Sequence, residues 1–136
     1  MTRKVKVLVF HAKSYIGNKA NGSEVVKEIE NSASAFAAEI GCLYIDVVKR
    51  TIGGKRYNII CDDDALGDEN ATIALLDRQN QNNNIFGTII IAGEEDRYGE
   101  LTDLSDDDIG NIVSRIGYVA GQIQEKETVC QVIVIS

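Results

Sequence analysis

The sequence predicts a single α+β domain over residues 1–136, built on one mixed or mostly antiparallel sheet of about five or six strands with a long helix of the C-terminal half packed on one face. Three observations predict this class. The 136 residues are 44% apolar and 26% charged, which is ordinary for one globular core. Short runs rich in Val and Ile alternate with turns that contain Gly and Asn. One later stretch repeats apolar residues at helical spacing.

The first element is predicted to be a strand. Lys4–His11 is apolar on both faces, which is typical of a central strand. The segment Tyr15–Ser23 is rich in Gly, Asn and Ser and predicts a loop. For Val25–Ile29 a strand is favoured over the start of a helix, because Asn31-Ser32 offers a better N-cap just afterwards. The Ala-rich segment Ala33–Ile40 then predicts a short helix, ended by the glycine that follows.

Two strands joined by a tight turn are predicted next. Leu43–Lys49 and Tyr57–Cys61 alternate, and the pair Gly53-Gly54 between them favours a primed hairpin turn, which needs positive φ. Basic residues crowd this turn in an otherwise acidic chain. They form the candidate site for a small anionic ligand such as a nucleotide: Lys49, Arg50, Lys55 and Arg56, with Tyr57 beside them. The alternative is that these cations are solvated and protect an edge strand from mispairing.

The middle of the chain is less regular. Ala71–Asp77 is a short apolar segment whose type the pattern leaves open. The tract Asn80–Asn84 predicts a loop, because Asn side chains compete with the helix backbone for hydrogen bonds. Ile85–Ala92 is the clearest strand of the sequence, and Gly87 within it indicates a bulge or a close backbone approach. The acidic segment Glu94–Tyr98 predicts a turn, because glycines bracket it on both sides.

The next helix has the strongest start signal in the sequence. Ser105 is an N-cap, Asp108 stands where a capping box places its acceptor, and Asp106–Asp108 put negative charge at the positive end of the helix dipole. Apolar residues then recur at steps of three and four, which predicts a helix that continues to Ile123: Ile109, Ile112, Val113, Ile116, Val119, Ala120 and Ile123. Helix capping therefore explains the acidic run. Acid–base catalysis by Asp103 and Asp106–Asp108 would need a pocket as well.

The last predicted strand is Val129–Ile135, which is apolar at nearly every position. An exposed edge of this kind would aggregate, so the strand must be covered. Burial inside the sheet of a single chain is the simpler expectation. A homodimer formed through this strand is the alternative.

The charge of the chain bears on its partners. Asp and Glu number 21 against 14 Lys and Arg, which gives a net charge of −7. This charge opposes binding to nucleic acid, which requires Lys and Arg on the phosphates, whereas it would suit an acidic DNA mimic that inhibits restriction. No apolar run reaches the roughly 20 residues of a membrane span, and the N-terminal strand does not resemble a secretory signal. We expect a cytoplasmic protein without membrane contact.

The sequence offers little for catalysis or metal binding. Cys42, Cys61 and Cys130 lie far apart and His11 is the single histidine, so we expect no metal site. A thiol nucleophile would need His11 as its base. The motifs of phosphate loops and nucleophile elbows are missing. We therefore expect no catalytic residues and no cofactor, and a function other than catalysis.

Two segments carry a family resemblance: Ile85-Phe86-Gly87-Thr88-Ile89-Ile90-Ile91-Ala92-Gly93 and Leu101-Thr102-Asp103-Leu104-Ser105-Asp106-Asp107-Asp108-Ile109. Over about residues 3–117 the chain resembles a family of small uncharacterised proteins found in Gram-positive bacteria and their phages and plasmids. The resemblance implies no catalytic residues. It favours an accessory protein of a phage or mobile element that acts by binding a host or phage protein.

Overall fold

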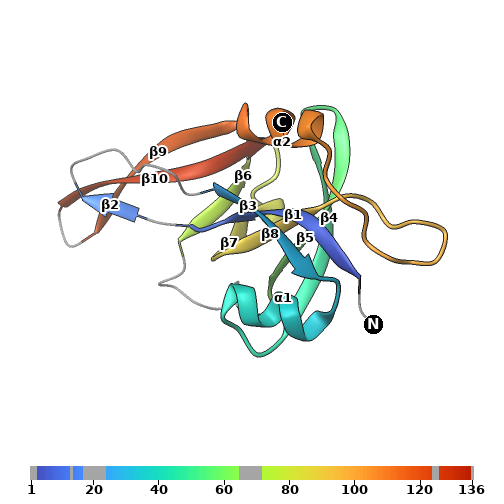
Figure 1. The fold of residues 1–136 in the computed structure, drawn as a ribbon. Coiled ribbons are helices and arrows are strands. Elements are labelled where there is room, and N and C mark those ends of the chain that lie inside the picture. The colour runs from blue at the N-terminus through green and yellow to red at the C-terminus, as the bar shows by residue number, and fades with distance from the viewer. Residues whose placement is uncertain (1–2, 13, 17–23, 65–71, 124–125, 136) are drawn as a thin grey trace.

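In the computed structural model of the chain, residues 3–12, 14–16, 24–64, 72–123 and 126–135 are described. They form two β-sheets and two short α-helices, so this part of the chain is mostly β (Figure 1). The prediction of an α+β fold with one sheet and a long helix in the C-terminal half is therefore wrong. Two local features account for the error: one predicted helix ends early, and one predicted strand divides between the sheets.

The first sheet, called sheet A here, is entirely antiparallel. Its spatial order is β3 (Glu24–Glu30), β1 (Lys4–Phe10), β8 (Ile89–Ala92), β5 (Lys55–Asp62) and β4 (Ile45–Ile52). The strands predicted in the first half of the chain are thus confirmed. β1 lies between β3 and β8, which is the central position that its two apolar faces predict.

The second sheet, sheet B, is built around the last strand. Its order is β2 (Ser14–Ile16), β10 (Lys126–Ile135), β6 (Ile73–Asp77) and β7 (Ile85–Phe86), while β9 (Ile116–Ile123) also pairs with β10. The β6–β10 pair is parallel and the others are antiparallel. β10 has neighbours on both edges, and its Val132 and Ile133 are fully buried. This confirms the expectation that the strand is covered within one chain.

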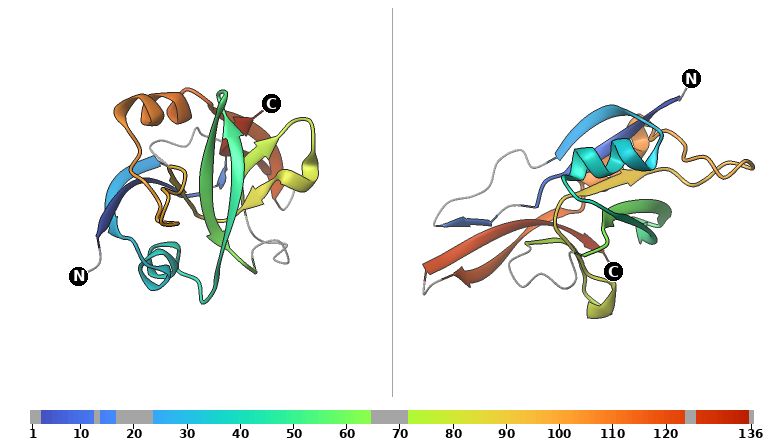
Figure 2. Two further views of the ribbon diagram at one scale, coloured as in Figure 1. Left: turned by 90° about the vertical axis from the view of Figure 1, so that its right-hand side faces the viewer. Right: turned by 90° about the horizontal axis from the view of Figure 1, so that it is seen from below.

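The molecule has three layers (Figure 2). The main core lies between the sheets, where Leu8 and Ile59 of sheet A pack with Leu75 and Ile133 of sheet B. A second core lies on the outer face of sheet A, where helix α1 (Ala33–Ile40) inserts Phe36. Burial of each large apolar side chain stabilises the fold by about 1.5–3 kcal/mol. Both edge strands of sheet A contribute to these clusters, β4 through Ile52 and β3 through Ile29.

Both helices begin as the sequence predicts. At the start of α1, Ser32 Oγ accepts from the N–H of Ala35 at 3.2 Å, and Gly41 ends the helix with a φ of 84°. Helix α2 (Asp106–Val113) has the predicted capping box. The hydroxyl of Ser105 accepts from the N–H of Asp108 at 3.1 Å, and the Asp108 carboxylate accepts from the N–H of Ser105 at 2.9 Å.

The predicted extension of this second helix to Ile123 is wrong. α2 ends at Val113, and the next residues form β9. Gly117 and Gly121 each cost about 1 kcal/mol relative to Ala inside a helix, whereas the neighbouring Val, Ile and Tyr residues favour strands. Antiparallel pairing with β10 along the whole of β9 therefore outweighs the helical spacing of its apolar residues.

The strand predicted over Ile85–Ala92 is extended but not continuous. β7 belongs to sheet B and β8 to sheet A, so the chain crosses from one sheet to the other between them. Gly87 lies at the crossing with a φ of 83°, and its N–H donates to the carbonyl of Thr72 at 2.8 Å. The positive φ explains why glycine occupies this position.

Three further segments contain short elements of secondary structure. The segment Ala71–Asp77, whose type the pattern leaves open, contains strand β6. The Asn tract contains a short 3-10 helix, η2 (Gln81–Asn83). A loop is predicted over Tyr15–Ser23, but its first two residues belong to strand β2. Residues 17–23 lie outside the described residues. Within the described ranges, no helix has both the length and the apolar character needed to cross a membrane.

Candidate functional site

The candidate anion site is carried by the β4–β5 hairpin, whose geometry follows from its sequence. The two strands pair up to Ile52 and Lys55, and the turn between them has positive φ at both Gly53 and Gly54, 58° and 85°. A type I′ turn requires this conformation. Gly53 is also required by space, because a Cβ there would lie 2.0 Å from Oδ1 of Asn111. The predicted primed turn is confirmed.

The five predicted site residues divide between the two faces of the hairpin. Directly opposite residues of antiparallel strands share a face. Arg50 lies opposite Tyr57, on the face that looks toward sheet B, and Lys55 is on this face as well. Lys49 and Arg56 lie on the other face. The five side chains therefore do not share one face, but β4 is an edge strand of sheet A, and a cavity at this edge can be lined from both faces.

Lys55 and Tyr57 are engaged by Asp108 of α2. The Lys55 ammonium donates to Asp108 Oδ1 at 2.6 Å, and the hydroxyl of the fully buried Tyr57 donates to the same oxygen at 2.9 Å. Asn111 Nδ2 donates to the Tyr57 hydroxyl at 3.0 Å. Burial raises the pKa of Asp108, but the hydrogen bonds from Lys55, from the Ser105 backbone and from Tyr57 outweigh it and lower the pKa to about 2. This network joins the hairpin to α2.

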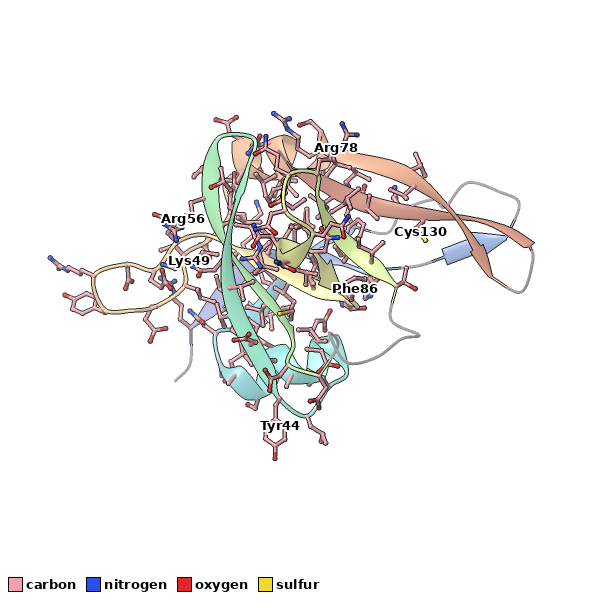
Figure 3. The ribbon with its side chains drawn as sticks, turned by 180° about the vertical axis from the view of Figure 1, so that it is seen from behind. Tyr44, Lys49, Arg56, Arg78, Phe86 and Cys130 are labelled. Atoms are coloured by element: carbon pink, nitrogen blue, oxygen red, sulfur yellow. The ribbon has the colours of Figure 1, made fainter. Side chains whose placement is uncertain are left out.

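The other three predicted residues line one hollow of about 460 Å³ at the edge of β4. Figure 3 shows Lys49 and Arg56 near each other beside this strand. The turn after β6 supplies the facing wall. We call this cavity the basic hollow; its lining residues are Lys49, Arg50, Thr51, Arg56, Asp77, Gln79, Asn80, Asn83 and Ile135. The structure thus brings together three of the five predicted residues, with an amide wall that sequence reasoning missed.

The three cations of the basic hollow are held in different ways. Lys49 donates to Glu95 Oε2 at 2.8 Å, and this bond is the main cause that lowers the pKa of Glu95 to about 2. Arg50 donates Nε to the carbonyl of Asn83 at 3.1 Å and Nη1 to the carbonyl of Lys49 at 2.8 Å. Arg56 is exposed and forms no salt bridge with any residue that the structure describes. Arg56 and the remaining N–H groups of Arg50 are therefore available to an anion.

The amide wall is an ordered turn built by Asp77. Its carboxylate accepts from the backbone N–H groups of Gln79 and Asn80, at 2.9 and 3.2 Å, and from Nδ2 of Asn83 at 3.0 Å. Asn84 Oδ1 in turn accepts from the Asp77 N–H at 2.7 Å. The sequence signal is an Asp followed closely by Asn residues, which favour such local bonds. This signal predicts a turn, but it does not predict which strand the turn faces.

The chemistry of the hollow suits an oxyanion. Arg presents a planar fork that matches phosphate or carboxylate, and amide side chains add N–H donors. The described residues contain no group of three or more His, Cys, Asp or Glu placed to hold a metal ion. Cys61 lies nearby, but burial, and after it the charge of Asp46, raise the pKa of its thiol to about 11. At neutral pH this thiol is protonated and is therefore a poor nucleophile.

Three carboxylates at the start of α2 and just before it have structural partners. Asp103 Oδ1 accepts from the backbone N–H of Lys6 at 2.8 Å, and Asp106 lies 3.3 Å from the Lys6 ammonium. Asp108 belongs to the capping box and to the network with Tyr57. The predicted capping role is thus confirmed for Asp108, whereas Asp103 and Asp106 contact Lys6.

A family model described as a domain of unknown function, DUF3846, matches residues 18–117. No curated protein and no solved structure matches the chain. The matched region includes the hairpin, the Asp77 turn and α2, which are the elements that build the basic hollow and the Asp108 network. Because the match spans well over half of the 136 residues, the chain belongs to the DUF3846 family, a domain of unknown function.

Proposed function

We propose that the protein binds a small oxyanionic ligand, such as a phosphate-bearing metabolite, in the basic hollow. The observation that carries this proposal is the convergence of Lys49, Arg50 and Arg56 on one cavity in a chain whose net charge is −7. Cations scattered for solubility would not be expected to share a cavity with three amide side chains. The volume of about 460 Å³ lies within the range of about 300–1,000 Å³ that is common for small-molecule sites.

The hollow is partly organised before any ligand binds. Two backbone carbonyls already orient the Arg50 guanidinium, so less side-chain freedom is lost when it donates to an anion. Five N–H groups are available on an Arg side chain, and these two bonds use two of them. Tyr57 is fully buried and therefore cannot stack on a ligand in this hollow. Recognition in the basic hollow therefore depends on charge and hydrogen bonds.

Calorimetric titration with inorganic phosphate at low ionic strength tests the proposal. We expect saturable binding that Arg56→Gln weakens about tenfold, because one charge-assisted hydrogen-bond pair is lost. Arg97→Gln is the matched control. Arg97 is exposed in the 94–98 turn, over the Tyr98 ring, and does not line the hollow. Absence of saturable binding, or an equal loss in both variants, would overturn the proposal.

A second candidate function is that of an accessory protein of a phage or mobile element that binds a host or phage protein. Its support is a group of exposed apolar side chains where α1 leads into β4. Leu43 is 85% exposed, Tyr44 70% and Val47 45%. Figure 3 shows Tyr44 at one end of the molecule, directed outward. Contiguous exposed apolar residues are typical of protein interaction sites.

Photo-crosslinking in a native host tests this second candidate. We expect Tyr44→Ser to abolish a specific crosslinked partner, because a large aromatic contact is removed. Tyr98→Ser is the matched control, since Tyr98 is 74% exposed on a different loop. A partner that both variants lose, or that neither loses, would remove the support from the Leu43–Val47 surface.

The acidic DNA-mimic alternative has less support than either of these. A DNA mimic needs carboxylates displayed to a DNA-binding protein. Here Asp103 and Asp106 contact Lys6, and Asp108 is buried in its network. The Asp103 bond and the burial of Asp108 reduce the acidic charge that residues 103–108 offer to a partner, whereas the Asp106 side chain stays exposed.

A further inference from the structure

A second hollow adjoins the basic hollow. It has a volume of about 100 Å³ and shares Arg50 with its larger neighbour. Apolar atoms of Val48, Ile85 and Phe86 form much of its wall. Figure 3 shows Phe86 on the far side of β4 from Lys49 and Arg56. The two hollows therefore lie next to each other along β4, separated by the Arg50 side chain, which lines both.

The two hollows differ in charge. The basic hollow is lined by three cations and the Asp77 carboxylate, whereas the second hollow is lined by Arg50 and three carboxylates, Asp46, Asp62 and Asp63. Local backbone bonds use only part of the acceptor capacity of these carboxylates. Asp46 Oδ1 accepts from the N–H of Val47 at 2.9 Å, and Asp62 Oδ1 accepts from the N–H of Asp64 at 3.0 Å. An ionised carboxylate has about four acceptor positions, so each retains some for a ligand.

The size and the walls of the second hollow limit what it can hold. An apolar cavity of about 150 Å³ encloses benzene, so a space of about 100 Å³ can hold only part of one small ring, and the rest of the ring would lie at its opening to solvent. The half-buried Phe86 offers an aromatic surface to such a ring. Cys61 is also part of the wall, and its protonated thiol adds no charge.

We propose that the ligand is a phosphorylated small molecule whose far end is a single ring bearing an amino group. The phosphate occupies the basic hollow, and the ring enters the second hollow with its amino group directed at the carboxylates. This inference rests on the proposed anion-binding function and narrows it. Carboxylates accept from amino groups, as Asp and Glu do from the cytosine amino group, and they repel carbonyl oxygens. A cytidine nucleotide and an amino-sugar phosphate share this chemistry.

Calorimetry on the full chain with two matched pairs of ligands tests the inference. The pairs are cytidine and uridine monophosphate, and glucosamine 6-phosphate and glucose 6-phosphate, with inorganic phosphate as the reference. Within at least one pair, the amino-bearing member should bind about tenfold more tightly, which corresponds to one hydrogen bond to a charged group. The pair that shows the preference identifies the source of the amino group.

Substitutions locate the preference. Asp46→Asn combined with Asp62→Asn should reduce the preference for the amino-bearing ligand to less than about twofold, while phosphate affinity stays unchanged or rises. Asp64→Asn is the matched control, because Asp64 is exposed and does not line the hollow. Phe86→Ala should weaken the ring-bearing ligand severalfold and leave inorganic phosphate unaffected.

The outcomes separate the two proposals. Phosphate binding that depends on Arg56, without a preference in either pair, would overturn this inference and leave the proposed function standing. A preference that survives the double Asp substitution would overturn the inference in the same way. If neither phosphate nor any of the four ligands binds, both proposals are overturned. A preference that disappears in the double variant and persists in Asp64→Asn supports the inference.

Discussion

Asp108 shows how much one side chain contributes to this hairpin. It caps α2, accepts from the Lys55 ammonium at 2.6 Å and accepts from the Tyr57 hydroxyl at 2.9 Å. The carboxylate is buried, so the charge would be costly without these donors. The same bonds orient Tyr57 within the core and thereby hold β5, the partner of the strand that carries Lys49 and Arg50. The residue stabilises the site without lining it.

Asp108→Asn is expected to lower the free energy of unfolding by about 1–3 kcal/mol near pH 7, the value of hydrogen bonds to a charged group. The folded pKa of about 2 lies below the unfolded value of about 3.9. The stabilisation is therefore full above about pH 4 and is lost as pH falls through the folded pKa. Urea unfolding between pH 2 and pH 7 should show this acid dependence in the natural protein and a weaker one in the variant.

The control for this substitution is Asp106→Asn. The Asp106 side chain is 97% exposed and lies 3.3 Å from the Lys6 ammonium, so its loss should cost less than about 0.5 kcal/mol. Equal destabilisation by both changes would show that the buried network contributes no more than a surface pair.

Gly53→Ala and Gly54→Ala separate backbone strain from crowding at neighbouring positions. Both glycines have positive φ, and an L-residue in that conformation costs about 1–2 kcal/mol. An added Cβ meets nothing at Gly54, whereas at Gly53 it displaces Asn111 from its bonds to the Ile52 carbonyl and the Tyr57 hydroxyl. Gly53→Ala should therefore cost about 1–2 kcal/mol more in thermal or urea unfolding. Equal costs would mean that the Asn111 bonds are not needed.

At the scale of elements, a Gly→Ala substitution should have opposite effects on stability in the two helices. Gly110 lies inside α2 with no atom within 4 Å of an added Cβ, and Gly41 ends α1 with a φ of 84° and is equally uncrowded. Gly110→Ala should stabilise the protein by about 0.5–1 kcal/mol, because Ala loses less backbone entropy. Gly41→Ala should destabilise it by about 1 kcal/mol, because Ala resists positive φ. Changes of the same sign in differential calorimetry would contradict this assignment.

The same elements show where sequence reasoning succeeds and where it stops. Caps and turns depend on a few adjacent residues, so the predictions at Ser32, Ser105 and Gly53-Gly54 are confirmed. β9 depends on pairing with β10, a partner that the helical spacing of its own residues does not reveal. The division of Ile85–Ala92 likewise depends on which strands lie beside each half.

The candidate site also depends partly on local sequence and partly on contacts between distant segments. Composition located the basic hairpin, but the alternation of faces and the burial of Tyr57 decide which of its residues meet. The Asp77 turn enters the basic hollow because β6 and β10 pair in parallel beside the hairpin, a relation between distant segments. Local patterns therefore identified the three cations that line the basic hollow. The turn that faces them is placed there by the tertiary fold.

At the scale of the whole molecule, an anion meets two opposing fields. The net charge of −7 repels it, while Lys49, Arg50 and Arg56 attract it locally. Salt near physiological strength screens charges that lie more than about 8–10 Å apart. It therefore weakens the repulsion by the net charge more than the attraction by the three nearby cations. The local charge is itself reduced, because Glu95 holds the Lys49 ammonium at 2.8 Å. The state of this one pair should therefore affect affinity more than the overall charge does.

Glu95→Gln is expected to strengthen phosphate binding about fivefold, because it frees the Lys49 ammonium for the ligand and removes a carboxylate beside the hollow. The free energy of unfolding should fall by less than about 1 kcal/mol, since the Lys49 and Glu95 side chains are still 40% and 32% exposed. Glu94→Gln is the control: it alters the net charge equally, and Glu94 is exposed and forms no salt bridge within the described residues. Calorimetric titration of both variants should show a clear gain for Glu95→Gln and less than about a twofold gain for Glu94→Gln. Equal gains would mean that net charge governs binding, and weaker binding by Glu95→Gln would mean that Glu95 is needed to position Lys49.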